Sequence, residues 1–144
     1  MEQKETINKQ YVLEVNETQL RIIRDALESY LRTRMGQFTD LAEDIAGVGF
    51  NWLNHTDEQF MDYINRKDNS QKLFEAAFHV AQPKLEKKTE RMLIAEDIWQ
   101  VIRHELWKNM PKEHRGGYYY LCVDASEPMQ FSGQPLPKCR LEET

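Results

Sequence analysis

The sequence predicts an α+β fold in which a small antiparallel sheet packs against long helices. Apolar residues recur at helical spacing in two long stretches, an alternating stretch precedes the first, and strand-forming residues follow the second. The order strand, helices, strands is typical of a sheet made from an N-terminal strand and C-terminal strands. The 144 residues fit a single α+β domain, 1–144, whose polar residues 1–9 we expect to be flexible.

The N-terminal strand is expected just before the first helix. Tyr11, Leu13 and Val15 alternate with their neighbours in the two-residue period of a β-strand. Asn16 is followed three residues later by Gln19, which is the pattern of a capping box at a helix start. The sequence therefore predicts a strand that ends where a long helix begins.

The first helical stretch contains a glycine in its middle. Its apolar residues recur at steps of three and four: Leu20, Ile23, Leu27, Leu31, Met35, Phe38, Ala42 and Ile45. Gly36 is either a C-terminal cap, with Arg32 and Arg34 near the negative end of the helix dipole, or an interior residue of a helix that continues to Ala46. The unbroken apolar phase favours continuation. A mid-helix glycine costs roughly 1 kcal/mol, so close approach of a partner or ligand is then expected.

The middle of the chain predicts a loop and two shorter helices. Three apolar residues gather on the loop after Gly49: Phe50, Trp52 and Leu53. One helix starts near Thr56 and ends at a turn over residues 67–70. A second helix, capped by Ser70, ends at Pro83.

The second strong helix spans about 89–109. Its buried face is expected to carry Leu93, Ala95, Ile98, Trp99, Ile102 and Leu106. Strand formers then fill residues 118–124, residues 129–131 are expected to pair back as a hairpin, and 138–142 are expected to form an edge strand.

Composition excludes several classes of protein. The net charge of −5 argues against binding to a nucleic-acid duplex, and no apolar run approaches the roughly 18 residues of a membrane span. The N-terminus is polar from Met1, unlike a secretory signal peptide. Cys122 and Cys139 lack the spacing of a redox or metal motif, as in a reducing compartment. We therefore expect a cytoplasmic protein that acts without a membrane.

No pattern in the chain indicates catalysis or a cofactor. The four histidines, His55, His79, His104 and His114, lack the spacing of metal-binding motifs. Asp97 and His104 lie seven residues apart on one helix face and are the best pair for a shared ligand, although a hydrogen-bonded histidine is favoured. There is no nucleophile elbow and no phosphate-binding glycine loop. We expect no enzyme activity, no cofactor and no bound metal.

Arginines and aromatic residues occur together on both strong helices. Arginine suits phosphate oxygens and an aromatic ring can stack on a base. The predicted ligand-binding residues are Tyr30, Arg32, Arg34, Gln37, Trp99, Arg103, His104 and Trp107. Ordinary surface ion pairs for the arginines, and a core position for Trp99, are the alternatives.

Three sets of residues carry a resemblance to a known family. They are Tyr30-x-Arg32-x-x-x-Gly36-Gln37, the stretch from Ala95 to Trp107, and Asp124-x-x-Glu127-Pro128 with Ser132-Gly133-x-Pro135-Leu136-Pro137-Lys138. Together they resemble a widespread group of small proteins encoded by tailed phages of Gram-positive hosts. The resemblance spans about residues 11–140, although the middle, 47–88, is not diagnostic.

The resemblance implies a counter-defence function in the host cytoplasm. Small phage proteins of this kind include sponges, of the anti-CBASS and Thoeris anti-defence types, that bind cyclic nucleotide immune signals without cleaving them. It further implies a homo-oligomer with pockets between subunits. The arginines would then hold phosphates, the aromatic residues would stack on a base, and Gln37 and His104 would hydrogen-bond to base or ribose. The alternative is a protein-interaction module that inhibits a host protein or serves phage assembly.

Overall fold

The computed structural model describes residues 9–81, 88–115 and 123–142. In these ranges the elements are α1 (Glu17–Arg34), α2 (Thr39–Ala46), α3 (Asp57–Ala81), α4 (Glu90–Lys108) and the 3-10 turns η1 (Lys112–His114) and η3 (Val123–Ala125). The predicted α+β fold is wrong, because none of the described residues forms a β-strand.

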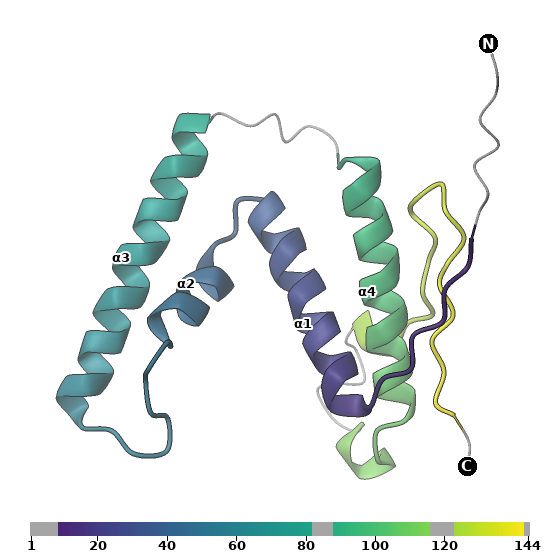
Figure 1. Cartoon of the computed structure of the whole chain (residues 1–144), viewed down its shortest axis with the longest axis horizontal. Helices are drawn as coiled ribbons and strands as arrows, with labels where there is room; N and C mark the ends of the chain where they lie inside the picture. The colour runs from purple at the N-terminus through teal and green to yellow at the C-terminus, as the bar shows by residue number, and fades with distance from the viewer. Residues whose placement is uncertain (1–8, 82–87, 116–122, 143–144) are drawn as a thin grey trace.

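The helices pack as two pairs (Figure 1). α1 and α4 run antiparallel and, with the chain from η3 to residue 142, form what we call the core lobe. α2 and α3 form the arm, and α1 contacts the arm mainly through α2. The core lobe centres on buried Leu31, Met92 and Ala95, against which Leu27, Tyr30 and Trp99 pack.

α1 ends at a glycine cap, so its predicted continuation through Gly36 is wrong. The last helical residue is Arg34, and Gly36 has φ +77°, a left-handed conformation that only glycine adopts readily. The N–H of Gly36 donates to the carbonyl of Thr33 at 3.1 Å, and that of Gln37 donates to the carbonyl of Arg32 at 2.8 Å. This pair of bonds is a Schellman motif, which satisfies carbonyls that the helix end leaves free.

The apolar stripe continues past Gly36 in a helix with a new direction. Phe38 and Ala42 of the predicted stripe are buried there, whereas Met35 and Ile45 are 44% and 48% exposed, so the predicted period holds only in part beyond α1. A close approach to the glycine is also present. A Cβ at Gly36 would lie 2.8 Å from the ring of Phe78 on α3.

α3 is one helix of 25 residues, and the predicted turn at 67–70 is part of it. No glycine or proline interrupts the helix. Buried Tyr63 and half-buried Phe74 and Phe78 share one face at spacings of 11 and 4 residues, which are close to whole helical turns. Packing of this face on α2 outweighs the low helix propensity of Asp68, Asn69 and Ser70.

The predicted strands lack partners. Tyr11, Val12 and Leu13 are 87%, 91% and 72% exposed, so neither alternating face of this segment is buried. Residues 129–131 and 138–142 are extended but not paired in a sheet, and the predicted strand residues 118–122 lie outside the described ranges. The capping box at Asn16 is confirmed, and Thr89 caps α4.

Candidate functional site

The predicted ligand-binding residues of α4 come together around Asp124. The guanidinium of Arg103 pairs with the Asp124 carboxylate and lies 4.1 Å from the centroid of the Trp99 ring. His104 is buried, with Nδ1 at 2.9 Å from the Asp124 carbonyl and its ring stacked on Trp107. Arg103 and His104 therefore hold the η3 turn against α4, and the charge of Arg103 is neutralised within the chain. The buried indole N–H groups of Trp99 and Trp107 have no hydrogen-bond partner among the described residues.

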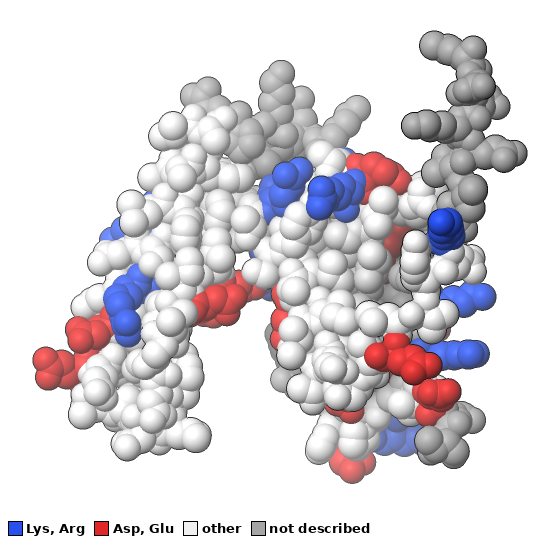
Figure 2. All heavy atoms as spheres, viewed as in Figure 1, with Lys and Arg blue, Asp and Glu red and all other residues white. Residues whose placement is uncertain are grey.

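Arg32, on α1, is also neutralised by carboxylates. Its guanidinium lies 2.7 Å from Glu28 and 3.3 Å from Asp40, and the hydrogen bond to Glu28 is the main reason that the pKa of Arg32 is raised. It lines a groove of about 320 Å³ with Asp25, Glu28, Ser29, Asp40, Glu43 and Asp44. Figure 2 shows acidic side chains on both sides of the opening between the arm and the core lobe. Such a groove repels phosphate.

The remaining predicted residues do not complete one site. Tyr30 packs against the core, whereas Arg34 and Gln37 are exposed near the end of α1. Gly36 faces Phe78 of the arm, while the Arg103 group lies toward the other end of the antiparallel α1/α4 pair. The arginines of the two helices therefore do not converge within one chain.

A row of polar side chains on α4 includes Asp97 and His104, which the sequence singled out as a pair, and Glu90 and Gln100, which it did not. Asp97 is only 2% exposed and accepts hydrogen bonds from the Phe131 N–H at 2.8 Å, the Ser132 N–H at 3.1 Å and the Ser132 hydroxyl at 2.6 Å. Burial raises the pKa of Asp97, but these hydrogen bonds, with one from Gln100, lower it by more, so its pKa lies below the ordinary value.

Other side chains of α4 bind the same extended segment through its backbone. The Gln100 amide donates to the Met129 carbonyl, and its oxygen accepts from the Met129 N–H at 2.8 Å. Glu90 accepts from the Gly133 N–H at 2.7 Å. We call Glu90, Asp97, Gln100 and His104 the α4 polar row. These side chains satisfy backbone groups that a sheet would otherwise have paired.

Ser132 is not a nucleophile in this arrangement. Its hydroxyl is buried and donates to Asp97, while its oxygen accepts from the Gln134 N–H at 3.1 Å. The carboxylate therefore fixes the loop and does not activate the serine. The available sequence signal was a carboxylate at Asp97, between the apolar residues Ala95 and Ile98, together with the Ser132-Gly133 turn that needed acceptors.

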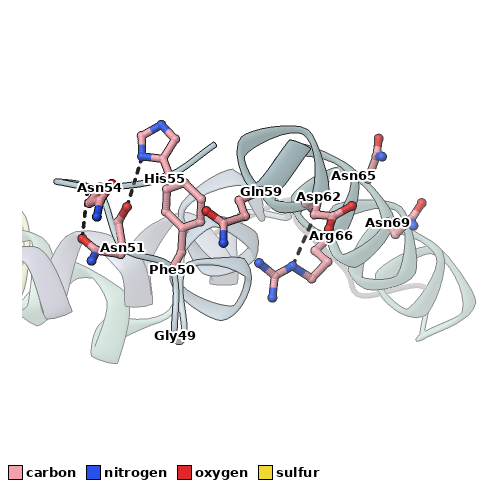
Figure 3. Close-up of a pocket in the computed structure, with 10 residues that line it drawn as sticks. All are labelled: Gly49, Phe50, Asn51, Asn54, His55, Gln59, Asp62, Asn65, Arg66 and Asn69. Carbon is pink, nitrogen blue, oxygen red and sulfur yellow. Dashed lines mark hydrogen bonds between the residues drawn. The ribbon is translucent and has the colours of Figure 1, made fainter. Parts of the chain in front are cut away.

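The arm carries an open groove and an aromatic cluster. The groove, of about 560 Å³, lies between the loop after α2 and α3 (Figure 3). Its lining residues are Gly49, Phe50, Asn51, Asn54, His55, Gln59, Asp62, Asn65, Arg66 and Asn69. Next to it, the Phe50 ring lies 4.8 Å from Trp52 and 5.0 Å from Tyr63, between ring centroids.

The described parts of the chain contain neither a cluster of metal-binding side chains nor a membrane-spanning helix. No group of three or more His, Cys, Asp or Glu side chains there is arranged to hold a metal ion. None of the described helices is long and apolar enough to span a membrane. Comparisons with protein-family models, with curated proteins and with solved structures find no match for this chain.

Proposed function

We propose that this chain is a non-catalytic protein-interaction module whose arm binds a protein partner. The binding surface is the arm tip, which we define as residues 47–56 with the first two turns of α3. The single observation that carries the proposal is the exposure of large apolar side chains there. Val48 is 75% exposed, Trp52 57%, Leu53 99% and Met61 53%. Clustered apolar side chains of this kind are typical of protein-binding surfaces.

The tip offers the chemistry of an interface hot spot. Trp52 is held by ring contacts with Phe50 and Tyr63, so it is positioned before a partner arrives. Tryptophan and tyrosine dominate hot spots because they bury a large area at a small cost in conformational entropy. Leu53 projects from the same loop with almost no contact to its own chain.

The arm as a whole is short of contacts within its own chain. Tyr63 is the one buried residue among the 25 of α3. The exposed apolar side chains of the arm also support the prediction of a homo-oligomer, in which a second copy covers part of this surface.

Site-specific photo-crosslinking tests the proposal. A photo-reactive amino acid replaces Leu53, and in a control it replaces Leu141, which is 63% exposed on the core lobe. We expect one defined protein, either a host protein or a second copy of this chain, to crosslink at position 53 and not at 141. Unlabelled wild-type chain should compete for this crosslink, whereas a competitor that carries Leu53→Asp should not. Equal crosslinking at both positions would overturn the proposal.

Sequestration of a cyclic nucleotide is the second candidate function. The resemblance to phage counter-defence sponges supports it, and so does the groove of the arm, where Phe50, Arg66 and the amide of Asn69 supply a ring, a cation and hydrogen bonds. Calorimetry against cyclic dinucleotides, cyclic oligonucleotides and cyclic ADP-ribose isomers tests it. Failure of every compound to bind more tightly than about 10 μM would exclude this function.

A further inference from the structure

The chain itself demonstrates one way in which a helix recognises an extended backbone. Along the α4 polar row, Gln100 pairs with both backbone groups of Met129, and Asp97 accepts two consecutive backbone N–H groups. These row residues fall within an arc of about 80° on the helix. Gln100 thus replaces the neighbouring strand that Met129 would otherwise need, and Asp97 fixes the bend that follows.

α3 carries a comparable row of polar side chains. No other backbone segment of the described chain pairs with this row as Met129 pairs with Gln100. Gln59, Asp62, Arg66 and Asn69 follow one another at steps of three and four, again within an arc of about 80°. All four are exposed and line the groove, and Figure 3 shows them in sequence along the helix. Asn51 and Asn54 come from the loop across the groove.

Most of the hydrogen-bonding capacity of this row is unused among the described residues. Asp62 accepts there only through its backbone carbonyl, and Figure 3 shows no hydrogen bond from the side chain of Asp62 or Asn69 to the other residues drawn. Gln59 uses its oxygen to accept from the Thr56 N–H at 2.9 Å, which leaves the two amide hydrogens. Arg66 donates only through Nε, to the Asp62 carbonyl at 3.4 Å. The groove therefore offers both donors and acceptors, as a peptide backbone requires.

Charge and shape narrow the class of ligand. Asp62 and Arg66 are neighbours of opposite charge, so the centre of the groove has little net charge and suits an uncharged backbone more than a polyanion. Phe50 lines the groove near Gln59 and offers a contact surface for one apolar side chain. Alternate side chains of an extended segment point to opposite sides, so one set would face Phe50 and the other solvent.

We propose that the α3 row binds an extended peptide segment of the protein partner through its backbone, as Gln100 of the α4 polar row binds both backbone groups of Met129. This inference rests on the proposed function and adds how the arm recognises the backbone of its partner. The arm tip supplies apolar contacts and the groove supplies backbone pairing. The partner's bound segment is extended and uncharged where it crosses Asp62 and Arg66.

Selected peptides test the inference. Dodecapeptides that bind the full chain are taken from a random library, and their affinities are measured by calorimetry for wild type, Asn69→Leu and Arg66→Met. Lys72→Leu, at an exposed α3 position outside the groove, is the control. We expect at least a tenfold loss with each groove variant, no change with the control, and a tenfold loss when a single backbone nitrogen of the peptide is methylated.

Two results would overturn this inference. One is an affinity that neither the groove variants nor backbone methylation changes, and the other is a peptide that becomes helical on binding, as shown by circular dichroism. Failure of the proposed function looks different, because crosslinking at position 53 would then be lost or nonspecific. If crosslinking at position 53 is specific but Asn69→Leu does not change the peptide affinity, the proposed function stands and only the peptide-binding role of the α3 row is excluded.

Discussion

The carboxylate of Asp97 and the hydroxyl of Ser132, 35 positions apart, form a buried hydrogen bond of 2.6 Å. This bond, with the two backbone N–H groups that the same carboxylate accepts, fixes the C-terminal segment on α4. The segment makes no sheet, so side chains of α4 are the main polar partners of its backbone. The stability of this half of the molecule should therefore depend on a single carboxylate.

Asp97→Asn should lower the free energy of unfolding by about 2–3 kcal/mol at pH 7. An amide presents its NH₂ group to at least one of the Ser132 and Phe131 donors and loses the charge that strengthens their bonds. Urea denaturation measures the loss, and hydrogen exchange should show faster exchange of the Phe131 and Ser132 amides. Asp44→Asn, at an exposed carboxylate, is the control and should change stability by less than about 0.5 kcal/mol.

The same carboxylate predicts a specific dependence of stability on pH. The pKa of Asp97 is lowered in the folded chain, so its stabilisation is complete above the unfolded value of about 3.9 and is lost as the pH falls through the folded value. The difference in unfolding free energy between wild type and Asp97→Asn should be constant from pH 7 to about 5 and should shrink below about 4. A difference that stays constant to pH 3 would contradict the lowered pKa.

Gln100→Glu should detach the segment near Met129. Gln100 both donates to the Met129 carbonyl and accepts from its N–H, whereas a carboxylate can only accept and would repel the carbonyl. We expect a loss of about 1–2 kcal/mol at pH 7. Chemical denaturation measures it, with Gln100→Met as the variant that removes both bonds without adding a charge. If Gln100→Glu has the same free energy of unfolding as wild type, the contact with the Met129 carbonyl does not contribute.

The sequence was a good guide to the starts of α1 and α4, whereas the helix start that it predicted at Ser70 was wrong because Ser70 lies inside α3. The capping box at Asn16 and the cap at Thr89 mark the starts of α1 and α4, because both depend on side chains only three residues away. The end of α1 was mispredicted. An apolar period continues across a Schellman motif when the following helix buries the same stripe, as Phe38 and Ala42 do in α2.

The absent sheet and the dispersed arginines could not be predicted from local pattern. A strand needs a partner, and whether the chain near Met129 pairs with a strand or with Gln100 is decided by packing between distant residues. The spacing of Arg103 likewise did not reveal that Asp124 would neutralise it. The exposure of Trp52 and Leu53 could not be predicted for the same reason. The sequence of their loop does not indicate whether the core lobe packs over these two side chains.

The end of α1 has two reasons for a glycine, namely its positive φ and the close approach of the Phe78 ring, and Gly36→Ala and Gly49→Ala separate them. Both glycines have positive φ, +77° and +76°, but a Cβ at Gly36 would lie 2.8 Å from the Phe78 ring, whereas one at Gly49 would meet no atom within 4 Å. Gly49→Ala should therefore cost only the backbone strain, about 1 kcal/mol, and Gly36→Ala should cost more because Phe78 must move. Denaturation of Gly36→Ala, Phe78→Leu and the double variant completes the test. A positive interaction between the two sites is expected, and additive losses would show that the ring contact does not matter.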